Sequence, residues 1–225
     1  MSRSVVLACL ASGGGRTILN LADAIEAGRL QAKISIVLAS RRGTLAAERC
    51  RNRGLTVEEP PEGCDPDAWI IERLESHAPE LVCLCGYLRL LPIPPWLIDR
   101  VINIHPALLP DFGGCGMYGR AVHEAVIRSG RTESGCTVHL VDDVYDHGVT
   151  ILQRRCPVLP GDDADTLAAR VFEQERLALP EAIDLIRAGR VRRTDGPVEI
   201  APPGHAWPDA IATGDIRGTD AADVG

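Results

Sequence analysis

Over the first hundred residues, short apolar runs alternate with helical segments, and this pattern constrains the fold more than any other feature. Residues 4–11 (SVVLACLA) and 80–85 (ELVCLC) are almost wholly apolar, as in strands buried on both faces. Residues 18–28 and 67–77 carry apolar side chains at helical spacing. Alternating strands and helices predict an α/β fold with a doubly wound, mostly parallel sheet of Rossmann-like type.

The second half departs from this alternation. Residues 134–141 and 149–157 both have strand patterns, and a short acidic loop joins them, which predicts an antiparallel pair. A long amphipathic helix is expected over residues 163–186, interrupted near Pro180. Residues 1–190 are therefore expected to form one domain. Residues 191–225, rich in Gly, Pro, Asp and Ala, are expected to be a flexible tail, disordered or laid over the surface.

Composition excludes several functional classes. The chain has 225 residues, a net charge of −7 and 4% aromatic residues, which disfavours nucleic-acid and membrane-surface binding. No apolar run is long enough to span a bilayer and no secretory signal is recognisable, so a cytoplasmic location is expected. The eight cysteines are expected to be free core thiols. The C-x-C pair at 83 and 85 lacks zinc-site spacing, so no metal is expected.

Three loops follow predicted strands and should meet at one edge of the sheet. They are residues 12–17 (SGGGRT), 86–92 (GYLRLLP) and the long Gly/Pro-rich stretch that begins at Pro106. Ligands of doubly wound sheets bind beyond the carboxyl ends of the strands. The SGGGRT segment matches neither dinucleotide nor Walker glycine motifs, so a tight turn and a phosphate site are alternatives. The convergence of the three loops favours the phosphate site.

The strand over residues 101–105 (VINIH) ends in two polar side chains that face the same side, Asn103 and His105. An amide donor, an imidazole and a nearby carboxylate suit acyl-type transfer, in which an oxyanion forms and a proton moves. The carboxylate candidates are Asp142, Asp143 and Asp146, and such a group would raise the pKa of His105. The G-x-S-x-G nucleophile motif is missing, which favours direct attack without a covalent intermediate. The alternative is that Asn103 and His105 are structural caps, and His123 and His139 are expected to be structural.

The segment NIHPALLP (residues 103–110) resembles the N-I-H-P-S-L-L-P signature of folate-dependent formyltransferases. Residues 134–139 (SGCTVH) and the stretch from Asp146 to Gln153 are similar to the second motif of that family, and the resemblance covers about residues 4–190. Within the family, the branch that formylates 5-phosphoribosylglycinamide in purine biosynthesis is the most similar. The resemblance implies transfer of a formyl group from 10-formyltetrahydrofolate, small-molecule partners only, and a monomer or homodimer.

The resemblance also implies residue roles. His105 would be the proton donor, Asn103 would polarise the formyl oxygen and contact the folate, and Asp146 would raise the pKa of His105. Substrate would be bound by Gly15, Arg16, Thr17, Pro106 and Glu175. The folate would be contacted by Leu88, Arg89, Leu90 and Leu91.

Some features depart from the family pattern. The phosphate turn commonly reads S-G-N-G-S-N, whereas SGGGRT stands here and introduces the cation Arg16. An arginine that meets the folate tail in some relatives falls near Pro66, and residues 113–119 replace a shorter stretch. Branches of the family that formylate initiator tRNA carry a further carboxyl-terminal domain. A hydrolase branch carries an extra amino-terminal domain, whereas the first predicted strand of this chain starts at Ser4. A non-catalytic phosphate-binding module is the remaining alternative.

Overall fold

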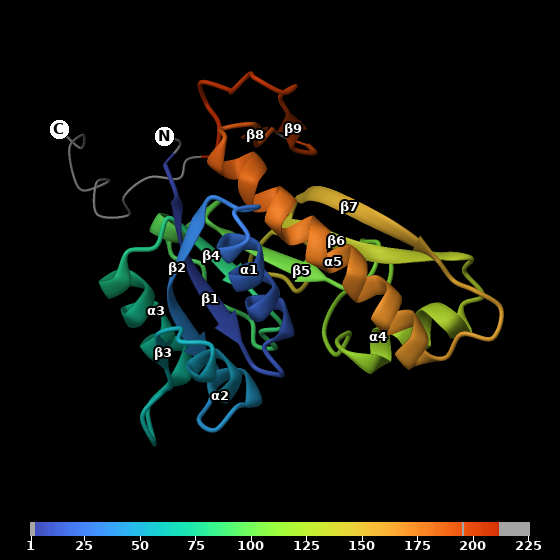
Figure 1. Ribbon diagram of the computed structural model, residues 1–225, viewed down its shortest axis with the longest axis horizontal. Helices are drawn as coiled ribbons and strands as arrows, with labels where there is room; N and C mark the ends of the chain where they lie inside the picture. Colours follow the sequence, from blue (N-terminus) through green and yellow to red (C-terminus); the bar gives the residue numbers. More distant parts are fainter. Residues whose placement is uncertain (1–2, 195, 212–225) are drawn as a thin grey trace.

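A computed structural model describes residues 3–194 and 196–211, and Figure 1 shows a central sheet covered by helices. The sheet has seven strands in the order β3-β2-β1-β4-β5-β6-β7. The first five strands in this order run parallel to one another. The strands are β1 (Val5–Ala11), β2 (Ala32–Ala39), β3 (Val57–Glu58), β4 (Leu81–Leu84), β5 (Val101–His105), β6 (Glu133–Leu140) and β7 (Thr150–Pro157). The predicted α/β, mostly parallel sheet is confirmed.

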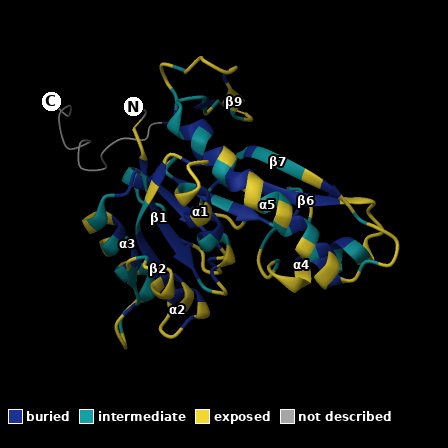
Figure 2. Ribbon diagram, in the orientation of Figure 1, coloured by how far each residue is buried: buried dark blue, intermediate teal, exposed yellow. Residues whose placement is uncertain are grey.

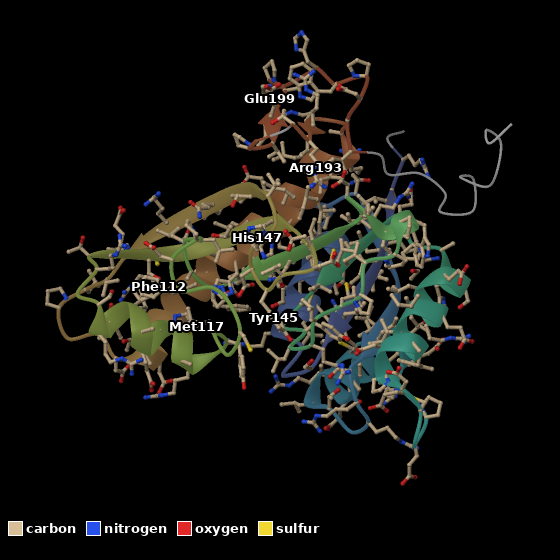
Figure 3. All side chains as sticks on the ribbon, turned by 180° about the vertical axis from the view of Figure 1, so that it is seen from behind. Phe112, Met117, Tyr145, His147, Arg193 and Glu199 are labelled. Atoms are coloured by element: carbon tan, nitrogen blue, oxygen red, sulfur yellow. The ribbon has the colours of Figure 1, made fainter. Side chains whose placement is uncertain are left out.

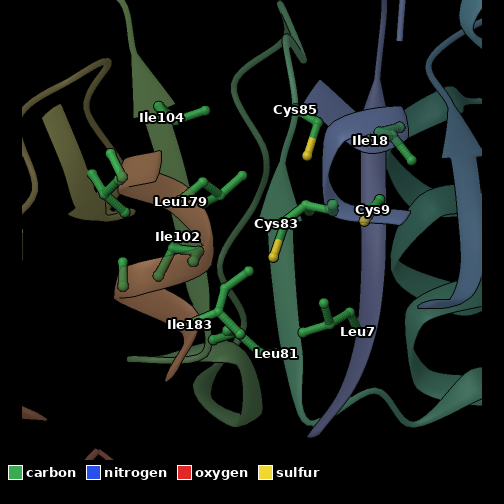
Figure 4. Packing of buried hydrophobic residues seen from close by; sticks show 14 of the residues in the cluster. Leu7, Cys9, Ile18, Leu81, Cys83, Cys85, Ile102, Ile104, Leu179 and Ile183 are labelled. Carbon is green, nitrogen blue, oxygen red and sulfur yellow. The ribbon is translucent and has the colours of Figure 1, made fainter. Parts of the chain in front are cut away.

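Helices cover both faces of the sheet. They are α1 (Arg16–Glu26), α2 (Leu45–Asn52), α3 (Pro66–His77), α4 (Arg120–Arg128), α5 (Ala164–Arg187) and the short 3-10 helix η1 (Pro95–Leu97). Successive residues of β1 supply opposite cores, because strand side chains alternate in direction. Cys9 packs in the core beneath α1 and α5, and Leu10 packs beneath α3. Figure 4 shows Cys9, Cys83 and Ile102 of the first core near Leu179 of α5, and Figure 2 shows how completely the central strands are buried.

The last two strands of the large sheet reverse direction. β5 pairs antiparallel with β6, and β6 pairs antiparallel with β7, so the predicted hairpin is confirmed. β6 ends with Leu140 opposite Ile102 of β5, and the loop between β6 and β7 then folds back along β5 so that Asp146 reaches His105. The end of β5 and the loop between β6 and β7, about forty residues apart in the chain, thus meet at the carboxyl end of β5.

The expected interruption of the long helix near Pro180 is wrong, because α5 is continuous from Ala164 to Arg187. A proline inside a helix removes one backbone donor and leaves the carbonyl four residues earlier without its partner. Here the carbonyl of Arg176 accepts a hydrogen bond from the side-chain Nδ2 of Asn20 at 3.1 Å instead. Asn20 belongs to α1, so the neighbouring helix supplies the missing donor.

Part of the predicted tail has regular structure. β8 (Val191–Arg192) and β9 (Glu199–Ile200) form a small antiparallel sheet beyond the end of α5. The guanidinium of Arg192 stacks on the ring of Trp207 at 3.8 Å, and Ile211 is buried against the main core. The segment up to Ile211 therefore lies over the surface, whereas residues 212–225 are outside the described residues. The division into a domain and a tail stays a prediction.

Candidate active site

A cavity of about 600 Å³ opens at the carboxyl ends of β1, β4 and β5. The order of the strands explains its place. From β1 the chain proceeds to β2 and β3 on one side, and then returns to β4 and β5 on the other, which makes a crevice between β1 and β4. The two loops at this crevice are tied together, because Leu88 N donates to Ser12 Oγ at 3.0 Å. All three loops singled out in the sequence line this cavity.

Asn103, His105 and Asp146, the three predicted catalytic side chains, lie together at the centre of the cavity. His105 Nδ1 is 3.3 Å from Asp146 Oδ2, and Asn103 Nδ2 donates to Asp146 Oδ1 at 3.3 Å. Of the three carboxylate candidates, only Asp146 reaches His105. Asp142 instead faces Nδ1 of the exposed His147 at 2.8 Å, and Asp143 is exposed.

His139, expected to be structural, belongs to the same cluster. Its Nδ1 donates to the carbonyl of Leu140 at 2.7 Å, so the neutral ring presents Nε2 as an acceptor. Asn103 Nδ2 donates to that nitrogen at 3.1 Å. The donor of Asn103 is therefore engaged by both His139 and Asp146 in the free site.

Burial sets the ionisation of the two central groups. Burial lowers the pKa of His105, and this outweighs the opposing effects of the Asp146 charge and the Phe112 carbonyl. The charge of Asp146 acts in the expected direction, because it raises the pKa of His105, although burial has the larger effect. Burial tends to raise the pKa of Asp146, but the two neighbouring histidines, His139 and His105, and a hydrogen bond from the Gly114 backbone N–H together lower it. At neutral pH the site therefore holds an imidazole beside a carboxylate.

The loop that follows β5 holds His105 from the other side. The Nε2–H of His105 donates to the Phe112 carbonyl at 2.8 Å, and Gly114 N donates to Asp146 Oδ2 at 3.0 Å. A Cβ on Gly113 would lie 2.6 Å from a methyl carbon of Leu109 and 3.0 Å from the Cβ of Asp146, so a side chain there would displace Leu109 and press on Asp146. Figure 3 shows Met117 of this loop and Tyr145 of the β6–β7 loop, which both line the cavity.

One end of the cavity is formed by the SGGGRT turn, whose Gly15, Arg16 and Thr17 all line it. Gly15 has φ 75°, and a Cβ there would lie 2.9 Å from the Cα of Ala46. The exposed Arg16 begins α1 and places its guanidinium 4.3 Å from the ring centroid of Phe172. Phe172 was not predicted as a site residue. Such a turn with an arginine suits an anion.

Glu175 lines the same end of the cavity from α5. It is partly buried, and burial raises its pKa to about 7, although the nearby Arg16 charge opposes the shift. Titration near neutral pH in a cleft is typical of functional carboxylates. Pro106, which follows His105, also lines the cavity.

Another part of the cavity wall is more apolar. Leu88, Leu90 and Leu91 line it, and Leu88 and Leu90 are exposed. Arg89 lines it too and is held by a bidentate ion pair with Asp67, at 2.8 and 2.7 Å. Exposed leucines at a cavity mouth suit a flat, largely apolar ligand.

Residues 3–194 and 196–211 contain no group of three or more His, Cys, Asp or Glu able to hold a metal ion. Within those ranges, every helix is too short or too polar to cross a bilayer.

Known proteins similar to this chain agree on the family. The family model for formyl transferase matches residues 5–183. The chain is 37% identical over 201 residues to the chloroplastic phosphoribosylglycinamide formyltransferase of Vigna unguiculata, covering 84% of this chain and 64% of that protein. It is 31% identical to phosphoribosylglycinamide formyltransferase of Haemophilus influenzae, covering 84% and 90%.

The fold comparison agrees as well. The crystal structure of glycinamide ribonucleotide transformylase 1 from Symbiobacterium toebii matches with a TM-score of 0.79 and 33% identity, over 90% of this chain and 96% of that one. The chain spans less than two thirds of some relatives, including only 15% of a trifunctional purine biosynthetic protein of Drosophila pseudoobscura pseudoobscura. The match to the family model nevertheless extends from the first strand to the last long helix. The chain belongs to the formyl transferase family.

Proposed function

We propose that this chain transfers a formyl group from 10-formyltetrahydrofolate to the amine of 5-phosphoribosylglycinamide, a step of purine biosynthesis. The family implies a folate-derived formyl donor, and the curated relatives named phosphoribosylglycinamide formyltransferase suggest the acceptor. The observation that carries the proposal is that one cavity joins an anion-binding turn, the Asn103–His105–Asp146 cluster and an apolar mouth. These three parts match the phosphate, the reacting amine and the folate.

The reaction begins with attack of the substrate amine on the formyl carbon. A carbon–nitrogen bond forms, the formyl oxygen becomes an oxyanion, and the attacking nitrogen becomes positively charged. His105 is neutral at rest because burial lowers its pKa. With its own proton on Nδ1, facing Asp146, and with the Phe112 carbonyl released, Nε2 can accept the proton from this nitrogen. The bond from the formyl carbon to the folate nitrogen then breaks, and His105 donates the proton to that leaving nitrogen.

Asp146 and Asn103 support the two charges of this intermediate. Asp146, 3.3 Å from His105 Nδ1, stabilises the transient imidazolium. Asn103 donates to the oxyanion by releasing one of its two partners, since Nδ2 is engaged by His139 and Asp146 in the free site. His105 must similarly exchange the Phe112 carbonyl for a substrate group.

The ends of the cavity fix the two substrates. The backbone of Gly15 and Thr17 and the Arg16 guanidinium bind the phosphate, and Glu175 accepts hydrogen bonds from the ribose hydroxyls. Pro106 contacts the acceptor beside His105. The segment from Leu88 to Leu91 binds the folate ring, largely through its backbone.

A competition assay tests this function. The protein is given 10-formyltetrahydrofolate with phosphoribosylglycinamide, water or charged initiator tRNA as acceptor, and release of tetrahydrofolate is followed. Formylation of phosphoribosylglycinamide should exceed the other two rates by several orders of magnitude. Preferential release with water alone would indicate a hydrolase, and preference for tRNA would indicate a tRNA formyltransferase.

A further inference from the structure

His123 is a buried polar residue of the cavity that the mechanism above does not use. It lies on the inward face of α4 together with Val122 and Val126, and only 5% of its surface is exposed. Its Nδ1 is buried and has no hydrogen-bond partner among the described residues. Buried polar atoms are almost always paired, because desolvation without a partner is costly. The ring also lines the cavity, so rotation of the imidazole would let this unpaired nitrogen meet a bound molecule.

The position of His123 narrows down that molecule. The ring lines the same cavity as the catalytic cluster and the SGGGRT turn. Burial lowers the pKa of His123, and the charges of His105 and Arg16 lower it further, so both groups are electrostatic neighbours of the ring. His123 therefore lies close enough to both the catalytic centre and the anion end for their charges to affect its pKa.

The chemistry of the ring fits a neutral group. A neutral imidazole offers one donor and one acceptor, which suits an amide or a hydroxyl. A phosphate is better served by the arginine and the backbone donors of the turn. The reacting amine is already served by His105, and the ribose hydroxyls are served by Glu175. The segment left between the phosphate and the reacting amine is the amide of the acceptor.

We propose that His123 is a substrate-binding residue that hydrogen-bonds the neutral segment of the acceptor, between its phosphate and its reacting amine. This assignment rests on the proposed function, because it takes phosphoribosylglycinamide as the acceptor. It makes α4 a third wall of the acceptor site, beside the turn before α1 and the carboxyl end of β5.

The test compares three variants with the unaltered protein. His123→Leu removes both ring nitrogens, and His123→Asn keeps a carboxamide near the position of Nδ1. Glu124→Gln is the matched control, since Glu124 lies on the same helix and pairs with the exposed Arg120 outside the cavity. KM is measured for phosphoribosylglycinamide and for 10-formyltetrahydrofolate, and binding of phosphoribosylglycinamide alone is measured by calorimetry.

His123→Leu should raise KM and the dissociation constant for phosphoribosylglycinamide about tenfold, the scale of one lost hydrogen bond. Its KM for the folate should stay within about twofold, and its thermal midpoint should not fall, since no partner in the free protein is lost. His123→Asn should recover most of the acceptor affinity. Acceptor binding within twofold of normal in the Leu variant, or an equal rise of both KM values, would overturn the assignment of His123 alone. An unaltered protein that formylates no phosphoribosylglycinamide would instead overturn the proposed function.

Discussion

The two ends of the proposed acceptor site are built in opposite ways. At the catalytic end, Asn103, His105, His139 and Asp146 are joined by mutual contacts, and the two imidazoles are 3% and 2% exposed. At the anion end, a glycine turn supplies backbone donors, and its one cation, Arg16, is exposed and rests on Phe172. The catalytic end is thus a buried network of side chains, and the anion end is an exposed turn of backbone groups.

The difference follows from what each end has to do. Charge that develops during a reaction needs donors and acceptors already in position, because their reorganisation would add to the barrier. A phosphate carries its charge before, during and after the reaction, so its binding site contributes equally to the ground state and the transition state. Substitutions at the catalytic end should therefore lower kcat, and substitutions at the anion end should raise KM.

His105→Ala should give the largest effect. Loss of the group that moves the proton should lower kcat by about two to four orders of magnitude. The KM for phosphoribosylglycinamide should change little, because His105 does not hold the phosphate. Steady-state kinetics with both substrates measure this, and His147→Ala, an exposed histidine of the neighbouring loop, is the control. A rate within a few-fold of normal in a folded variant would remove His105 from the mechanism.

Asp146→Asn should have the next largest effect. An opposite charge within about 4–6 Å shifts a pKa by about one to three units, so losing it should lower kcat by roughly one to three orders of magnitude. Because Asp146 opposes the effect of burial, the pKa of His105 should fall further below its ordinary value. NMR titration of the imidazole follows this shift. If the pKa of His105 were the same in the Asn variant, Asp146 would have no electrostatic effect on His105.

Arg16→Gln tests the other end of the comparison. The substitution removes the exposed positive charge that is proposed to contact the phosphate. The KM for phosphoribosylglycinamide should therefore rise about tenfold, within the range of a hydrogen bond to a charged group. The value of kcat should hold within about twofold, and added salt should weaken the effect. Arg42→Gln, which removes an exposed arginine that does not line the cavity, serves as the control. A fall in kcat with unchanged KM would show that this end also takes part in the chemical step.

Phe172→Leu asks whether Arg16 is held in place. The cation–π contact at an exposed site is worth about 0.5–1 kcal/mol, so the KM for phosphoribosylglycinamide should rise about two- to fivefold. If Phe172 acts through Arg16, the double variant with Arg16→Gln should be no worse than Arg16→Gln alone. Phe172→Tyr, which keeps the aromatic face, should restore the normal KM. Additive effects in the double variant would contradict the coupling.

The sequence predicted the frame of the molecule well, because the frame depends on local patterns. Fully apolar runs such as residues 80–85 mark buried strands without any knowledge of their neighbours. The continuity of α5 was missed for a tertiary reason. The carbonyl freed by Pro180 is paired by Asn20, which lies 156 residues from Arg176 in the chain. No local pattern around Pro180 carries that information.

The residues of the candidate site likewise fall into two groups, those that local sequence patterns reveal and those that only tertiary contacts reveal. Asn103 and His105 were recognisable because both are polar at the end of one apolar strand. Asp146 was one of three neighbouring carboxylates, among which the family resemblance chose and the fold shows the contact with His105. His139 and Phe172 were missed because their roles depend on contacts across strands and between helices. The net ionisation of His105 was also beyond the sequence, since it depends on how deeply the ring is buried.

Glu175→Gln should give the smallest change and the sharpest test of how the two ends differ with pH. Burial raises the pKa of Glu175 to about 7, so its carboxylate fraction falls as the pH decreases from 8 to 6. If the carboxylate accepts from ribose hydroxyls, the KM for phosphoribosylglycinamide should rise a few-fold over that interval in the unaltered protein, and should be flat in the Gln variant. The folded pKa lies above the ordinary value near 4.5, so the folded state holds the proton more tightly and stability falls as the pH rises between them. The Gln variant should therefore have the higher thermal midpoint at pH 8 and lose that advantage at pH 4.5. A KM for phosphoribosylglycinamide that varies equally with pH in both proteins would place the titrating group elsewhere in the cavity.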